Sequence, residues 1–298
     1  MPRLAVLFLI LISALPGSCR SAGLSFRSAV RTRAIEIADT IDSNVAQFQI
    51  DRPGIIADAE LCTALTEELC DRILTIDVRR REIEIKGDAA LREMASQQSS
   101  RYRMVVSQLG ETAARVFVQM ANGSGYRVSL ALDSLAKMED AAVAPALLEA
   151  FQSADSTIRR AALRAAATSP SRIVNFQSET ALLLLDPDWT VRREACVTLG
   201  QSKLSGEKWD DALAEAMNDP QPLVASEAAR ALGTRKSLQR INTIIEFLER
   251  ARNANDPLSA EAAHAALAEI TNRKDMIPDP VAWRKWVEEN RPESRPAP

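Results

Sequence analysis

A recurrence of about 33 residues in the second half of the chain constrains its fold most. The segment from Asp186 to Gly200 opens with Asp-Pro-Asp and continues into an apolar-periodic stretch. The opening predicts a turn, and Asp188 can accept hydrogen bonds from the free N–H groups of a first helical turn. Val191, Ala195 and Leu199 follow at intervals of four and share one helix face. The terminal glycine of the segment suits a helix end.

Four further segments share features of this turn, and they begin near residues 122, 155, 219 and 256. The spacing between matching positions is 33 residues, except for the last, which is 37. Each copy pairs an apolar helix with a turn and a second, alanine-rich helix. Because a fixed period of this size indicates stacked helix pairs that bury a core only against their neighbours, we predict an all-α fold. An α-solenoid of about five antiparallel helix pairs is expected over residues 122–276.

The turn and the residues after it resemble HEAT-like repeats, the kind also found in phycobilin lyase subunits and in exported bacterial proteins with such repeats. The matching pattern is an aspartate in the turn, then an aliphatic residue and an arginine five and six positions on, here Asp186, Val191 and Arg192. The resemblance implies a structural ladder between neighbouring repeats, with Asp186, Arg192 and Arg159 as members. It weakens outward, since Ala225 replaces the arginine one unit later.

Residues 1–22 are typical of a secretory signal. A single arginine precedes an apolar core of about a dozen residues, 4–15, which is short for a membrane span. Small residues before Cys19 suggest a bacterial lipoprotein signal, although Pro16 stands where a leucine is usual. Ordinary cleavage between residues 17 and 23 is the alternative. Either interpretation predicts an extracytoplasmic protein, periplasmic or secreted, that meets a membrane only through a lipid anchor at Cys19.

Residues 23–121 lack the 33-residue period and form a separate N-terminal helical region in our interpretation. Asp51-Arg52-Pro53-Gly54 predicts a break in the first helix, and Gly87-Asp88 predicts another. We therefore expect two or three long helices here. After the repeats, residues 277–298 predict a tryptophan-bearing cap helix with a frayed tail, because Asp279 and Pro280 suit the first positions of a helix.

The sequence offers little for catalysis or cofactors. His264 is the only histidine, which excludes a metal site built on several histidines, and no cofactor is expected. Cys62 and Cys70 would lie about 12 Å apart on one helix, beyond disulfide reach, while a link from either to Cys196 stays open. The net charge of −3 provides no basic field for nucleic acid.

Three exposed features remain as candidates for binding. Arg79-Arg80-Arg81 with Lys86 forms the densest basic run, which suits an anionic partner or membrane headgroups, or is a solvated helix face neutralised by Glu82 and Glu84. Trp189 is either a partner anchor or a side chain packed on the adjacent repeat. Trp283 and Trp286 suit a cap over the last apolar surface better than a ligand platform.

In HEAT-like arrays the second helices line the concave side, so the resemblance implies a mixed-charge concave strip. Its residues are Arg160, Arg164, Arg193, Glu194, Glu227 and Arg230. Generic solvated surface is the competing interpretation. We favour an exported, non-catalytic adaptor or scaffold that binds another protein through this concave face. The alternative is a phycobilin-lyase-like or other small-molecule-handling enzyme built on the same repeats.

Overall fold

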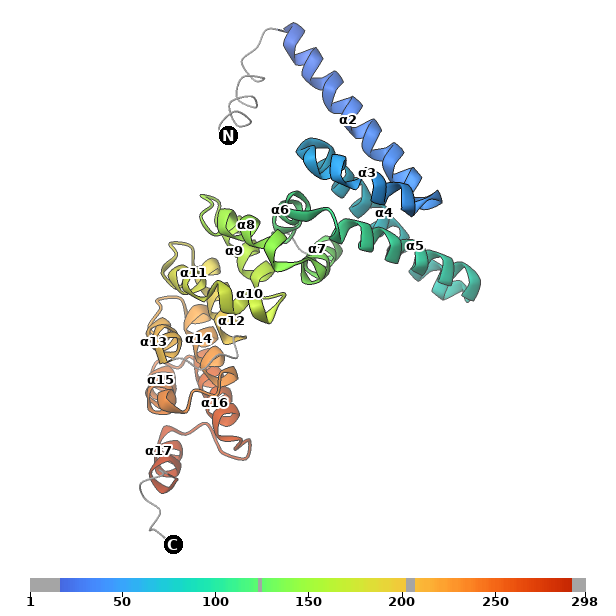
Figure 1. Ribbon diagram of the computed structural model, residues 1–298. Coiled ribbons are helices and arrows are strands. Elements are labelled where there is room, and N and C mark those ends of the chain that lie inside the picture. Colours follow the sequence, from blue (N-terminus) through green and yellow to red (C-terminus); the bar gives the residue numbers. More distant parts are fainter. Residues whose placement is uncertain (1–16, 123–124, 202–206, 291–298) are drawn as a thin grey trace. The chain divides into compact units, whose positions relative to one another are not determined.

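The computed structural model describes residues 17–122, 125–201 and 207–290. In this part of the chain it contains sixteen α-helices, two short 3₁₀ helices and no strand (Figure 1). The all-α fold predicted from the sequence is therefore confirmed. Most of the predicted signal segment 1–22, together with the side chain of Cys19, lies outside the described residues.

The chain packs into two compact units, Met1–Ala146 and Leu147–Pro298. This division by packing falls later than the predicted start of the repeats at residue 122, and the boundaries expected from the repeat pattern stay predictions.

Unit 1 is a helical assembly around one long helix. Its helices are α2 (Gly17–Ser43), α3 (Val45–Ala57), α4 (Ala59–Lys86), α5 (Ala89–Ser107), α6 (Gly110–Met120), α7 (Tyr126–Lys137) and the first half of α8 (Asp140–Phe151). Leu65, Leu69 and Ile73 of α4 are fully buried, and α2, α5 and α6 all pack on this helix. The apolar spacing of α4 therefore places the centre of this core.

The break predicted at residues 51–54 is wrong, because α3 runs through Pro53. The helix ends lie instead at Asn44 and Asp58, whose side chains accept hydrogen bonds from the N–H groups of the following helical turns. An interior proline costs about 3 kcal/mol, and burial of Phe48 and Ile55 on α3 offsets that cost. Residues 23–121 consequently fall in five helices, and three of these, α2, α4 and α5, are long, as expected.

Unit 2 contains the repeats. Its elements are α9 (Ser156–Ala166), α10 (Pro170–Asn175), α11 (Gln177–Leu182), η1 (Leu183–Leu185), α12 (Trp189–Gly200), α13 (Glu207–Ala216), α14 (Pro222–Thr234), η2 (Leu238–Arg240), α15 (Ile241–Asn253), α16 (Pro257–Thr271) and α17 (Pro280–Glu289). The second helices α9, α12, α14 and α16 pack successively in one layer, and α13 and α15 lie in another (Figure 1). This is the arrangement of a solenoid.

The first helix of the repeat that precedes the Asp186 turn is not continuous. It is split into α10, α11 and η1, with the junction at Phe176, whose backbone leaves the helical region. The ring of Phe176 is buried and lies 5.7 Å from the ring of Phe151, centroid to centroid. The turn at Phe176 therefore coincides with an aromatic contact that helical periodicity alone does not reveal.

Glycines set how closely the second helices approach. A Cβ atom on Gly200 would lie 2.9 Å from the Cβ of Ala231, and one on Gly233 would lie 2.7 Å from the Cα of Ala266. Real Cβ atoms do not approach other carbons so closely. Gly200 does end α12, as expected, but the capping position is Gln201 in a right-handed conformation. The glycine is needed for helix packing rather than for a left-handed cap.

Helix α17 closes the last repeat. Asp279 accepts hydrogen bonds from the N–H groups of the first turn, and Pro280 occupies the start of the helix. Trp283 is fully buried, and its ring lies 5.9 Å from that of His264 and 6.4 Å from that of Trp286. Trp283 therefore packs as a core residue between α17 and the last second helix.

Candidate binding surfaces

The first rung of the ladder joins Arg159 to Asp186. The guanidinium donates from Nε and Nη2 to the two carboxylate oxygens at 2.6 and 2.8 Å. Its Nη1 donates to the carbonyls of Ser153 and Ala154, at 2.8 and 3.1 Å. The hydrogen bond to Asp186 is the largest cause that raises the pKa of Arg159. The arginine thus ties its own turn to the next turn along the chain.

Arg192 repeats this geometry one unit later. It donates to Asp219 at 2.6 and 3.0 Å, and to the carbonyls of Asp186 and Pro187 at 2.8 and 3.2 Å. The structure therefore brings together the ladder residues that the resemblance implied, with Asp219 as the acceptor of the last arginine. The series stops there because Ala225 stands where the next arginine would be. Both ion pairs are largely buried, so they serve packing between repeats rather than binding.

The turn aspartates also begin the second helices. Asp188 accepts hydrogen bonds from the N–H and hydroxyl of Thr190, at 2.8 and 2.7 Å, and Asp155 does the same with Thr157. Hydrogen bonds from Ser156, the largest cause, and from Thr190 lower the pKa of Asp188 to about 2. The carboxylate therefore stays ionised through the physiological range and holds the helix start.

A third buried ion pair was missed by the sequence analysis. Nε of Arg235 lies 2.5 Å from Asp210, and the Ser237 hydroxyl donates to the other oxygen of the same carboxylate at 2.5 Å. Both charged side chains are almost completely buried. The repeat offered no signal for it, because the position 33 residues before Arg235 is Ser202.

The predicted strip forms two groups of ion pairs between successive second helices. Arg164 of α9 lies 3.3 Å from Glu194 of α12. Glu227 of α14 lies 3.8 Å from Arg193 of α12 and 3.9 Å from Arg230 of its own helix. The strip therefore crosses three helices of unit 2.

Arg160, the one residue of the predicted strip outside these two groups, differs from the others. Its Nε atom is buried and has no hydrogen-bond partner among the residues that the structure describes. The side chains of Arg193 and Arg230 are instead 48% and 38% exposed. The part of the strip that solvent reaches is thus mainly cationic, while the glutamates Glu194 and Glu227 are mostly covered.

Trp189 lies one helical turn before Arg193 on α12, so the two side chains share a face of that helix. Trp189 is 36% exposed. It is therefore neither fully packed on the adjacent repeat nor fully free, and it places an aromatic surface beside the exposed arginine.

Among the described residues, no group of three or more His, Cys, Asp and Glu residues is arranged to hold a metal ion. Within the same ranges no helix is both long and apolar enough to span a bilayer. Cys62, Cys70 and Cys196 are buried free thiols, so no disulfide joins Cys196 to either of the others.

Comparisons with known proteins agree with the geometry of unit 2. A family model for HEAT repeats matches residues 178–275. No curated protein matches the chain. Among solved structures, Kap121p is 15% identical with a TM-score of 0.52, over 95% of this chain and 33% of that one. Kap121p bound to Ste12p is 16% identical with a TM-score of 0.51, over 95% and 32%. An engineered protein is 19% identical with a TM-score of 0.43, over 74% and 97%.

This chain spans about a third of the length of Kap121p. At these identities the likeness shows the fold alone. The chain therefore contains a HEAT repeat domain within an all-α, HEAT-like solenoid, and the repeats expected from the sequence are confirmed over residues 178–275. Repeats of this kind commonly serve as protein-binding scaffolds and are typically non-catalytic.

Proposed function

We propose that this protein is an exported, non-catalytic adaptor that binds another protein through its second-helix face, the surface of α9, α12 and α14 that carries Arg160, Arg164, Arg193, Glu194, Glu227 and Arg230. The observation that carries this proposal is the exposure of Arg193 and Arg230 on successive helices. A stacked layer of helices with outward-facing cations offers an extended surface rather than a closed pocket. Export follows from the signal-like segment 1–22, and a lipid anchor at Cys19 would hold the adaptor at the envelope.

The partner would present carboxylates to this face. Glu227 is shared by Arg193 and Arg230 at 3.8 and 3.9 Å, distances at the outer limit of an ion pair. Because both arginines are partly exposed and the distances are long, each of these pairs contributes about 0–1 kcal/mol. Acidic side chains of a partner can therefore replace Glu227 with little loss, and the planar guanidinium groups can receive them in a two-pronged arrangement.

Trp189 supplies the apolar part of the same surface. Tryptophan and arginine are enriched among the residues that dominate protein-protein binding energy. Trp189 and Arg193 lie together on α12 and are both partly exposed. We therefore place the centre of the interface on these two residues, with an acidic and apolar partner segment across them.

The test is a capture experiment with the mature protein and two matched variants. The first variant carries Arg164→Glu, Arg193→Glu and Arg230→Glu on the second-helix face. The control carries Arg273→Glu, Lys274→Glu and Lys285→Glu, which make the same change of charge near α17. Arg160 is left unchanged because of its buried Nε atom.

An envelope extract is passed over each immobilised protein after circular dichroism has shown equal helix content. We expect one bound protein to be retained by the native chain and the control, and lost from the first variant. Retention by all three proteins would remove the second-helix face from the proposal. Trp189→Ala is then expected to weaken capture of the same partner at least tenfold, which a loss of charge alone would not explain.

A further inference from the structure

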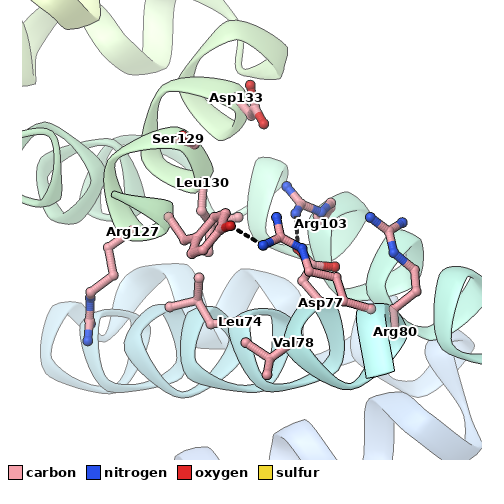
Figure 2. Close-up of a pocket in the computed structure, with 11 residues that line it drawn as sticks. Leu74, Asp77, Val78, Arg80, Arg103, Arg127, Ser129, Leu130 and Asp133 are labelled. Carbon is pink, nitrogen blue, oxygen red and sulfur yellow. Dashed lines mark hydrogen bonds and ion pairs between the residues drawn. The ribbon is translucent and has the colours of Figure 1, made fainter. Parts of the chain in front are cut away.

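Unit 1 contains a cavity that the adaptor proposal does not use. It has a volume of about 560 Å³ and lies among α4, α5 and α7 (Figure 2). Pockets for small molecules usually enclose about 300–1,000 Å³ and combine an apolar lining with a few polar groups. The size of this cavity therefore suits a small molecule.

The floor of the cavity is apolar. Leu74 and Val78 lie one turn apart on α4, and Leu130 comes from α7 (Figure 2). Leu130 is buried, whereas Val78 is 53% exposed. When a ligand covers a branched apolar side chain that has half its surface in water, the burial of that surface favours binding. The floor is thus suited to an aliphatic or aromatic group.

Four arginines and two aspartates line the same cavity, so its charge is positive although the whole chain is acidic. Figure 2 shows Arg127 at one end of the apolar floor, with Arg80 and Arg103 toward the other. Arg103 is already paired, since its Nη2 atom lies 2.6 Å from Asp77. Arg127 forms a longer pair of 3.5 Å with Asp71.

The remaining two arginines, Arg80 and Arg81, form no ion pair with an acidic side chain among the described residues. The guanidinium carbon of Arg81 lies 4.2 Å above the centre of the Tyr126 ring, and Nη1 of Arg81 donates a hydrogen bond to the Tyr126 hydroxyl. Arg80 forms no ion pair or hydrogen bond with any described residue. Residues 79–81 are exposed, as the solvated-face interpretation of the basic run expects, but no ion pair joins Glu82 or Glu84 to either arginine among the described residues.

We propose that this cavity binds a small anionic amphiphile. Its apolar body covers Leu74, Val78 and Leu130, and its carboxylate or phosphate group is held by Arg80 and Arg81. Guanidinium groups bind such oxyanions through paired, charge-assisted hydrogen bonds. Tyr126 holds Arg81 in place by stacking, which limits the side-chain entropy lost when the anion binds. Asp133 lines the cavity from α7 (Figure 2), and its carboxylate disfavours an anion next to it.

Decyl phosphate is the test ligand, used below its micelle concentration and titrated calorimetrically into the full mature chain. Two control ligands separate its parts: decan-1-ol has the apolar chain without the anion, and inorganic phosphate has the anion without the chain. We expect decyl phosphate to bind at least tenfold more tightly than either. Equally tight binding of inorganic phosphate would contradict a contribution from the apolar floor. Equally tight binding of decan-1-ol would contradict a contribution from the arginines.

Three variants locate the site. Arg80→Gln with Arg81→Gln should weaken decyl phosphate binding at least tenfold, and Val78→Asp should abolish it by placing a carboxylate on the floor. The control, Arg79→Gln with Arg92→Gln, removes two exposed arginines outside the cavity and should bind as the native chain does. All of these positions are exposed on helices. Undiminished binding by both cavity variants would overturn the proposal.

Vesicles distinguish a free amphiphile from a lipid in a bilayer. Cosedimentation with phosphatidylglycerol vesicles, lost in the Arg80→Gln, Arg81→Gln variant and absent with phosphatidylcholine, would identify the ligand as a membrane headgroup with its chain. Binding of monomeric decyl phosphate without cosedimentation would identify a soluble ligand. Vesicle binding without any binding of monomeric decyl phosphate would overturn the cavity as the site. The capture experiment on unit 2 uses none of these residues, so the two proposals succeed or fail separately.

Discussion

The guanidinium of Arg192 donates two hydrogen bonds to the carboxylate of Asp219, at 2.6 and 3.0 Å, and a third to the carbonyl of Asp186. One side chain thereby joins two successive turns of unit 2. The pair is largely buried, so each charge depends on the other for compensation of its lost hydration. The ladder consequently fixes the spacing of the turns, and it leaves the exposed arginines of the second-helix face available for other contacts.

Removing one member of this pair should be more damaging than removing both. Arg192→Met leaves Asp219 as an unpaired buried charge, and we expect the free energy of unfolding to fall by about 3 kcal/mol. The double variant Arg192→Met, Asp219→Leu should lose less, because no charge is then left without a partner. Urea unfolding followed by circular dichroism measures both. Arg193→Met, at an exposed position, is the control and should change stability by less than about 1 kcal/mol. Equal losses from Arg192→Met and the double variant would contradict this account.

Gly233, which has a close contact, and Gly54, which has none, predict opposite effects for the same substitution in different helices. Gly233→Ala forces a Cβ atom to within 2.7 Å of the Ala266 backbone, and we expect a loss of about 1–3 kcal/mol. Gly54→Ala meets nothing within 4 Å in helix α3. It should be neutral or stabilise by about 0.4–1 kcal/mol, because alanine is the better helix former. Thermal and urea unfolding compare the two proteins, and destabilisation by Gly54→Ala of similar size would show that packing is not the cause.

The starts of the repeat helices could be predicted because their signals are local. Asp155 and Asp188 accept hydrogen bonds from residues two positions on, so the turn and its cap lie within one short stretch of sequence. The break expected near Pro53 failed for the opposite reason, since burial of Phe48 and Ile55 against neighbouring helices keeps α3 continuous. The division at Phe176 likewise involves a contact with Phe151 on another helix.

The binding surfaces divide in the same way. Periodicity placed Arg193 and Glu227 on the second helices, but it could not show that Glu227 lies between two arginines. The basic run at residues 79–81 was visible, whereas its apolar neighbours were not, because Leu130 reaches the cavity from a helix some fifty residues later. Contacts between helices depend on how the helices pack, and that packing has no signature within a single repeat.

The three described cysteines should be protected thiols. Burial raises the pKa of Cys62 to about 11 and that of Cys70 to about 12, and it also raises that of Cys196. Because the thiolate is the reactive form, native protein at pH 8 should release almost no thionitrobenzoate from these positions with Ellman's reagent. Unfolding in urea should release three equivalents more than the native protein does. Rapid reaction of Ellman's reagent with the folded Cys19→Ala variant, which keeps only these three cysteines, would contradict the burial of their thiols.

His264 should make the closure by α17 sensitive to mild acid. Burial lowers the pKa of His264 below its usual 6.5, and its Nδ1 atom has no hydrogen-bond partner among the described residues. The unfolded chain therefore takes up a proton near pH 6.5 that the folded chain does not yet bind, so the stability held above pH 6.5 declines as the pH falls toward the folded pKa. The substitution His264→Gln removes the titrating imidazole without a large change in side-chain volume. We expect the drop in melting temperature between pH 7 and pH 5.5 to be smaller in His264→Gln than in the native protein, while Trp283 fluorescence reports whether α17 detaches first. An identical drop in both proteins would assign the acid sensitivity to carboxylates elsewhere and leave His264 a passive neighbour of Trp283.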